Sequence, residues 1–129
     1  MEKARVLVVE DHEDAGFVVC EMLDVLGYDA DHVPDGHAAV EYAVCNRYVA
    51  VLMDIEMPVL DGLQATEQIR KIESQAGIGP NHIIGTTGHT STGVRILCEK
   101  AGMNGFLLKP FSFEQLEQAL VKRAMPANP

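Results

Sequence analysis

The chain has 129 residues, of which 47% are hydrophobic and 22% are charged. That balance is typical of one soluble globular domain with a sizeable core. The formal net charge of -9 argues against direct contact between this chain and nucleic acid, and Val6–Val9 is too short an aliphatic run for membrane insertion. Three cysteines without a C-x-x-C pair indicate reduced thiols in a cytoplasmic protein.

The first part of the chain alternates a short apolar run with periodic amphipathic stretches. Arg5–Glu10 is apolar and β-branched and predicts a strand, and the helical stretch that follows ends at Gly27. Asp29–Val33 alternates weakly and makes a poor strand by itself, and the turn signal at residues 34–36 separates it from a second helix. The apolar residues of the two helices recur at spacings of three and four: Ala15, Val18, Val19, Met22 and Leu26, then Ala39, Val40, Ala43 and Val44.

The same alternation continues to the end of the chain. Three further runs predict strands: Val49–Asp54, Ile83–Thr87 and Gly105–Leu108. The segment at 75–82 is a loop by its Gly, Pro and Asn content, and Ser112 with Gln115 predicts a capping box for the last helix. The apolar faces of the three further helices are Leu63, Thr66, Ile69 and Ile72; Val94, Leu97, Cys98 and Ala101, ended by Gly102; and Phe113, Leu116 and Leu120.

Five repeats of strand then helix predict the fold class. Continuously apolar strands joined by amphipathic helices form a parallel sheet covered on both faces, and right-handed crossovers make it a doubly wound α/β fold. Rossmann-like and flavodoxin-like strand orders both fit, and five strands in 129 residues favour the flavodoxin-like order 2-1-3-4-5. We expect one domain over residues 1–125 and a tail or linker at 126–129.

Charged and hydroxyl side chains stand where four of these strands end. Glu10 and Asp11 follow the first strand, Asp54 ends the third, Thr87 the fourth and Lys109 the fifth. Taken singly, an acidic turn or a surface lysine explains each of them, but in this strand order they share one edge of the sheet. Repulsion among three carboxylates is relieved by a hard divalent cation such as Mg²⁺, and a carboxylate beside Mg²⁺ can act as a nucleophile toward a phosphoryl group.

Four segments give the chain its resemblance to a known family. They are "VVEDHED", "MDIEMPVLDG", "IIGTTGH" and "FLLKPF". On these segments the chain resembles the receiver domain of two-component response regulators over residues 4–123. It is most like the receivers of hybrid histidine kinases, which implies a phosphorelay intermediate.

The resemblance implies roles for the acidic residues. Asp54 is similar to the phosphoacceptor, Asp11 to the direct Mg²⁺ ligand and Glu10 to a ligand acting mainly through water. The backbone carbonyl of Glu56 would be the third protein ligand. Lys109 resembles the lysine that pairs with the phosphoryl group, and the family makes the bond from Lys109 to Pro110 cis.

The resemblance also implies a switch. Thr87 resembles the switch hydroxyl and Phe106 the switch aromatic, although Phe106 lacks the hydroxyl of the more frequent tyrosine. Gly88 stands where the family more often has alanine, so we expect a slightly more open site. Glu56 and His89 are predicted to flank the line of water attack and to tune the lifetime of the aspartyl phosphate.

The implied partners are a histidine kinase or a histidine phosphotransfer protein, with the partner face on the helices around 94–101 and 113–120. The main alternative is a Mg²⁺-dependent phosphohydrolase with an aspartyl nucleophile, for which Glu56 stands at the acid–base position but no cap domain is present. A flavodoxin-like nucleotide binder would want a glycine-rich loop after the first strand, where acids stand instead. A receiver used only for interaction would not need the intact acidic, threonine and lysine set.

Overall fold

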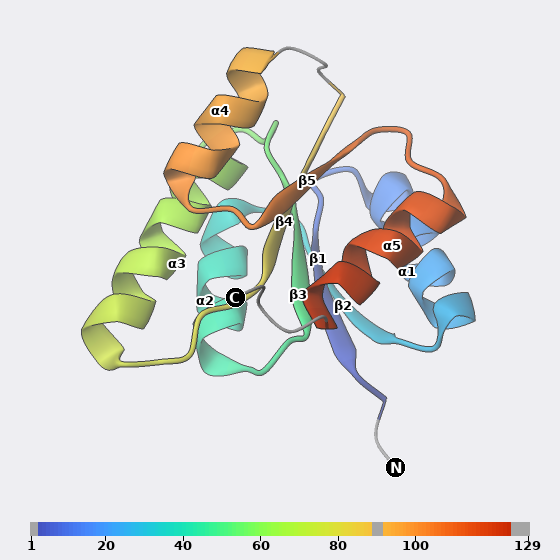
Figure 1. The fold of residues 1–129 in the computed structure, drawn as a ribbon, viewed down its shortest axis with the longest axis horizontal. Helices are drawn as coiled ribbons and strands as arrows, with labels where there is room; N and C mark the ends of the chain where they lie inside the picture. Colours follow the sequence, from blue (N-terminus) through green and yellow to red (C-terminus); the bar gives the residue numbers. More distant parts are fainter. Residues whose placement is uncertain (1–2, 89–91, 125–129) are drawn as a thin grey trace.

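The computed structural model describes residues 3–88 and 92–124, with the side chains of 92, 123 and 124 excepted. Figure 1 shows a central sheet between two layers of helices. All neighbouring strands are parallel and their order is β2-β1-β3-β4-β5, which confirms the predicted flavodoxin-like fold. The elements are β1 (Arg5–Val9), α1 (Glu13–Leu26), β2 (Asp29–Val33), α2 (Gly36–Cys45), β3 (Ala50–Asp54), α3 (Gly62–Ala76), β4 (Ile83–Thr87), α4 (Thr92–Ala101), β5 (Gly105–Leu108) and α5 (Phe113–Ala124).

The sheet has a hydrophobic core on each face. Helices α1 and α5 cover one face, and α2, α3 and α4 cover the other (Figure 1). Alternate residues of the central strands enter the two cores, which is why these strands read as apolar without a break. On the α1–α5 side the strand residues are Val6, Val8, Ala50, Leu52, Ile84 and Leu107, and on the other side Leu7, Val9, Val33, Val51, Met53 and Ile83.

Strand β2 lies at one edge of the sheet and pairs only with β1, as β5 does with β4 at the other edge. Of its residues only Val33 is fully buried, so the weak alternation of its sequence matches its half-covered position. Its polar residues are paired instead. Arg5 Nη1 donates to Asp31 Oδ1 at 2.9 Å, and the Tyr48 hydroxyl donates to Asp31 Oδ2 at 2.7 Å.

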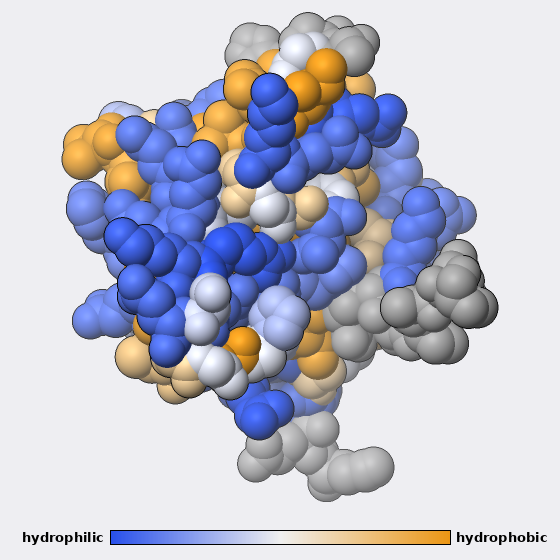
Figure 2. Space-filling view, turned by 60° about the vertical axis from the view of Figure 1, so that its left-hand side comes forward, coloured by the Kyte–Doolittle hydropathy of each residue, from blue (hydrophilic) through white to orange (hydrophobic). Residues whose placement is uncertain are grey.

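The helices present a mainly hydrophilic outer surface. In Figure 2 hydrophilic residues cover most of the face in view, and hydrophobic residues gather in small separate groups. Among the described residues no helix combines the length and the apolar character needed to cross a bilayer. Several buried polar residues lie at the carboxyl ends of the strands.

Candidate functional site

Glu10, Asp54 and Lys109 meet at the carboxyl end of the sheet. Glu10 directly follows β1, Asp54 ends β3 and Lys109 follows β5. The Lys109 Nζ lies 2.8 Å from Glu10 Oε1 and 3.3 Å from Asp54 Oδ2, so the ammonium group bridges two carboxylates. Glu10 is 4% exposed and Asp54 1% exposed. The strand order brings them together, because β1 and β3 are neighbours and β5 is separated from β3 only by β4.

Burial and ion pairing shift the pKa values of these three groups differently. Burial raises the pKa of Asp54 to about 6, against the N–H of Glu56 and the charge of Lys109. Burial would also raise the pKa of Glu10, but bonds from Lys109 and the His12 N–H lower it well below its usual range. Burial lowers the pKa of Lys109. The hydrogen bond to Glu10 and the charge of Asp54 outweigh burial, so the pKa of Lys109 is raised. One charged lysine therefore faces two carboxylates.

Asp11 adds a third carboxylate, and one of its oxygens is unsatisfied. Asp11 Oδ1 is buried and accepts no hydrogen bond from any described residue. His12 Nδ1 lies 3.3 Å from this oxygen, without hydrogen-bond geometry, and 3.2 Å from Glu10 Oε2. The hydrogen bond with Glu10 and the charge of Asp11 raise the pKa of His12. His12 was not predicted to belong to the site, because its position after Asp11 does not reveal where its side chain points.

The carboxylates of Glu10 and Asp11 fit a hard divalent cation. Oxygens of Glu10 and Asp11 and Nδ1 of His12 lie within 4.8 Å of one another. The buried Asp11 oxygen lacks a hydrogen-bond partner, and the carboxylates outnumber the one lysine among them. Carboxylate oxygens are the ligands that Mg²⁺ takes in proteins, together with water and phosphate.

The loop after β3 holds Asp54 and brings the start of α3 against the end of the strand. The N–H of Glu56 donates to Asp54 Oδ1 at 3.0 Å. A Cβ atom on Gly62 would overlap the carbonyl of Asp54, so only glycine lets α3 begin this close to the strand end. Asp61 caps α3 and forms a reciprocal capping box with Gln64. The Asp61-Gly62 pair in the sequence therefore serves the geometry of the loop.

The side chain of Glu56 contacts the end of β4. The Thr87 hydroxyl donates to Glu56 Oε2 at 3.1 Å, and the Gly88 N–H donates to Oε1 at 3.3 Å. Thr87 is fully buried, and its carbonyl accepts the backbone N–H of Lys109 at 2.6 Å. We expected the Glu56 carboxylate beside the path of an attacking water and did not predict its contact with Thr87. The carboxylate bonds the same hydroxyl that the resemblance assigns to the phosphoryl group.

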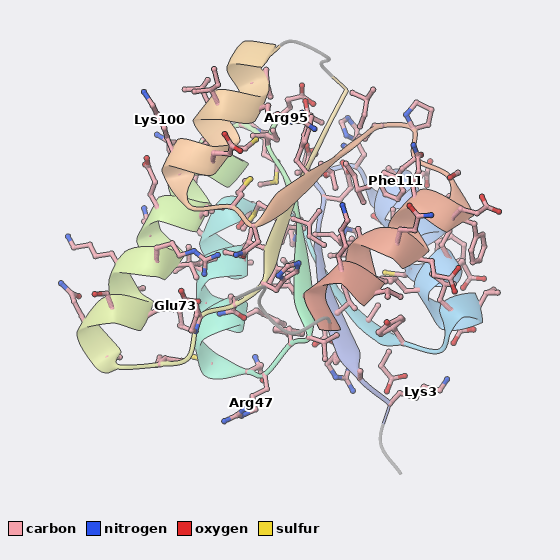
Figure 3. The ribbon with its side chains drawn as sticks, viewed as in Figure 1. Lys3, Arg47, Glu73, Arg95, Lys100 and Phe111 are labelled. Carbon is pink, nitrogen blue, oxygen red and sulfur yellow. The ribbon has the colours of Figure 1, made fainter. Side chains whose placement is uncertain are left out.

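The predicted switch aromatic lies further along the same side of the sheet. Phe106 is half-buried on β5, and the Arg95 guanidinium of α4 lies 5.0 Å from the centroid of its ring. Figure 3 shows Arg95 between α4 and the sheet. A cation over an aromatic face is an attractive contact. The contact between Arg95 and Phe106 was not predicted from the sequence. The bond from Lys109 to Pro110 is cis, as the resemblance implied. His89 lies outside the described residues, and its position beside the site stays a prediction.

Comparison with known proteins identifies the family. The response regulator receiver domain matches residues 6–121. The chain belongs to this family. The receiver is 35% identical over 118 residues to the sensor protein GacS of Pseudomonas syringae pv. syringae, an alignment that covers 92% of this chain. The same alignment covers 13% of GacS, so the chain spans only a small part of that relative's length.

Two solved structures place the receiver among its relatives. One is the receiver domain of the sensor histidine kinase PA1611 from Pseudomonas aeruginosa PAO1, crystallised with a magnesium ion in its active site cleft. It is 39% identical, with a TM-score of 0.82 and coverage of 95% of this chain and 97% of that one. The other is the complex of Ypd1 with the Ssk1 receiver from Saccharomyces cerevisiae, 26% identical, with a TM-score of 0.87 and coverage of 94% and 88%. The predicted resemblance to receivers of histidine kinases is confirmed.

Proposed function

We propose that this receiver takes a phosphoryl group from phosphohistidine onto Asp54 in a two-component phosphorelay. The observation that carries the proposal is the buried Asp54 carboxylate, held by the Glu56 N–H and 3.3 Å from Lys109 Nζ. An Asp54 oxygen bonds to phosphorus, the N–P bond of phosphohistidine breaks, and the freed imidazole nitrogen keeps the electron pair. Lys109 offsets the charge of the phosphoryl oxygens.

Mg²⁺ is the cofactor of this proposal. Glu10, Asp11 and Asp54, with the backbone carbonyl of Glu56, would hold it, and when bound it supplies positive charge for the phosphoryl oxygens. The unsatisfied Asp11 Oδ1 supports this assignment. The magnesium ion in the PA1611 receiver supports it by similarity.

The partners follow from the same chemistry. A histidine kinase or a histidine phosphotransfer protein would supply the phosphoryl group, as the pairing of Ypd1 with Ssk1 in their co-crystal structure supports. The faces of α4 and α5 would respond through Thr87 and Phe106, because a ligand that bonds one state better shifts the population toward it. Beryllofluoride should shift the NMR signals of Val94, Phe106 and Leu116. Shifts confined to the loop after Asp54 would contradict this response.

The domain limits and the location complete the proposal. We infer a receiver over residues 1–125 and a tail or linker at 126–129, supported by the family match to residue 121. The end of that range lies outside the described residues. The three cysteines are all free in the structure, which supports the predicted cytoplasmic location.

The phosphohydrolase alternative has less support. It would need the Glu56 carboxylate free to move protons at the reacting centre. Both of its oxygens instead accept hydrogen bonds, one from the Thr87 hydroxyl and one from the Gly88 N–H. The match to the receiver family supports the phosphoacceptor function instead.

Phosphotransfer profiling tests the proposal. The receiver is incubated with a panel of radiolabelled histidine kinases and histidine phosphotransfer proteins in Mg²⁺, beside the variant Asp54→Asn and the surface control Glu67→Gln. We expect rapid transfer from a small subset of donors to the wild type and to the control, and none to Asp54→Asn. Transfer to Asp54→Asn, or to no protein on a panel that labels other receivers, would contradict it.

A further inference from the structure

His32 contacts the acidic loop from the neighbouring strand. Its Nε2 lies 2.8 Å from the carbonyl oxygen of Glu10, and because a carbonyl only accepts, this nitrogen is the donor. On its other side, the Glu10 N–H donates to the carbonyl of Val33 at 3.1 Å. The peptide units before and after Glu10 are therefore both tied to β2. The bond from the His32 side chain holds the peptide unit after Glu10, beyond Val9 and Val33, where the pairing of β1 with β2 ends.

Gly16 makes room for this histidine. The imidazole occupies the space beside the first turn of α1 where a side chain of residue 16 would begin. A Cβ atom at residue 16 would overlap Cε1 and Nε2 of His32 and lie 2.8 Å from Nδ1. Gly16 has an ordinary helical position and no positive φ, so its backbone does not require glycine. Glycine elsewhere in a helix lowers stability, and here the close approach of the ring explains it.

We propose that His32, seated on Gly16, is a positioning residue for the metal-binding loop. It holds the carbonyl of Glu10, which fixes the peptide plane that leads into Asp11 and so aims the Asp11 carboxylate. The inference rests on the proposed function, because it assigns His32 to the Mg²⁺ site of the phosphoacceptor reaction. His32 touches neither the phosphoryl group nor the metal, and acts only through the loop.

The other hydrogen bonds described in the loop involve the N–H and the side chain of Glu10, whereas the bond from His32 is made to the carbonyl that leads into Asp11. His12, which begins the turn into α1, has no side-chain cap at the helix N-terminus, and its ring is exposed. The loop also carries like charges at Glu10 and Asp11, which repel each other before a cation binds. Groups that orient a metal ligand from behind commonly change metal affinity by about 10- to 100-fold when they are removed. Since His32 acts through the backbone, we expect the lower end of that range.

Calorimetric titration with Mg²⁺ separates the bond from the bulk of the side chain. His32→Leu keeps the bulk without a donor, and His32→Gln keeps a donor near the position of Nε2. His37→Leu makes the same change at an exposed position of α2 and serves as the control. We expect His32→Leu to weaken Mg²⁺ binding by about tenfold and His32→Gln by less than about threefold. His37→Leu should change nothing. Wild-type affinity in His32→Leu, or equal losses in His32→Leu and His32→Gln, would overturn the proposal.

A double-mutant cycle tests the seat on Gly16. Gly16→Ala should displace the ring and weaken Mg²⁺ binding about as much as His32→Leu does. In a His32→Ala background the same change has no ring to displace, so it should leave Mg²⁺ affinity unchanged and raise the urea midpoint through helix propensity. Equal losses of affinity in both backgrounds would show that the two residues act independently.

Hydrogen exchange in metal-free protein gives a readout that does not depend on the metal. The Glu10 amide bonds Val33, and the His12 amide bonds Glu10 Oε2 at 3.2 Å. Both should exchange several-fold faster in His32→Leu, while the amides of β3 keep their rates. Unchanged exchange at both amides would overturn the positioning role. If His32→Leu speeds exchange in this way but the wild type binds no Mg²⁺, the proposed function is contradicted. The role of His32 in the loop would still stand.

Discussion

Glu73 and Asp54 are both buried carboxylates, and they lie at opposite ends of the sheet. Glu73, on α3, is 4% exposed and sits by the amino ends of β4 and β5, while Asp54 is 1% exposed at the carboxyl end of β3. Glu73 accepts bonds from Arg70 Nη1 at 2.8 Å and from the backbone and side-chain nitrogens of Asn81 at 2.7 Å each. Asp54 accepts one backbone bond and shares Lys109 with Glu10.

The difference separates a structural carboxylate from a reactive one. Arg70 also donates to the carbonyls of Gly102 and Asn81, so the Glu73 charge lies within a network of satisfied donors. Figure 3 shows Glu73 on α3, in the part of the fold away from the strand ends that carry the site. Asp54 keeps a charge that its neighbours do not fully offset. An incompletely neutralised carboxylate is ready to bind a cation and to react, at some cost in stability.

Breaking the Glu73 network should have the largest effect on stability. Arg70→Leu removes the charged partner of Glu73 and leaves a buried carboxylate with Asn81 alone. We expect the free energy of unfolding to fall by about 3 kcal/mol, measured by urea denaturation. Arg47→Leu, at an exposed arginine that points away from the fold in Figure 3, should change it by less than about 0.5 kcal/mol. Equal effects of the two changes would mean that the network contributes little.

Neutralising the two carboxylates should have opposite effects. Burial raises the pKa of Asp54 from 3.8 to about 6, so the folded protein binds this proton more tightly than the unfolded chain does. The stability that Asp54 contributes is therefore present below pH 3.8 and is lost as the pH rises through about 6. With a chelator at pH 7, Asp54→Asn should be more stable than the wild type by about 1 kcal/mol, because solvent and Lys109 screen part of the charge.

Two comparisons sharpen this prediction. The advantage of Asp54→Asn should disappear when unfolding is measured near pH 4, where the wild-type carboxyl is protonated. Glu73→Gln replaces a fully bonded carboxylate and should instead lower stability by about 2 kcal/mol at pH 7. A loss of stability in both variants at pH 7 would mean that Asp54 is as well satisfied as Glu73.

The smallest expected effect concerns the lifetime of phospho-Asp54. Glu56→Ala combined with His89→Ala removes two groups predicted to orient water. Because Thr87 and Gly88 already bond both oxygens of Glu56, we expect much less than the limit of about 100-fold for general acid–base help. We expect a several-fold longer lifetime, measured as loss of label after the phosphodonor is removed. Mg²⁺ affinity should change little, because the proposed ligand from Glu56 is its carbonyl. A lifetime that is unchanged or shorter would show that these side chains shield the site.

The elements and their order could be predicted because burial on two faces leaves a clear pattern in sequence. β1 and β3 lie at the centre of the sheet, and their unbroken apolar runs identify them. β2 is only half-covered at an edge, so its pattern was weak. Once the strand order was known, the meeting of Glu10, Asp54 and Lys109 followed from the rule that parallel strands end at one edge.

The contacts within the site could not be predicted in the same way. They depend on the path of loops and on side-chain rotamers, which no periodicity records. The bond between Glu56 and Thr87 and the bond from His32 to Glu10 each join residues more than 20 positions apart. Gly16 carried a signal, as a glycine inside a helical stretch, but its partner became visible only in the structure.

Intact-mass measurement after incubation with acetyl phosphate tests the central claim most directly, because it needs no partner protein. Wild type, Asp54→Asn and the control Glu67→Gln are each compared with Mg²⁺ and with a chelator. The account predicts that wild type and control gain the mass of one phosphoryl group in Mg²⁺ and do not gain it in chelator. Asp54→Asn should gain nothing in either condition. A phosphoryl group on Asp54→Asn, or equal labelling of the wild type with the metal removed, would contradict the assignment of Asp54 as the Mg²⁺-dependent phosphoacceptor.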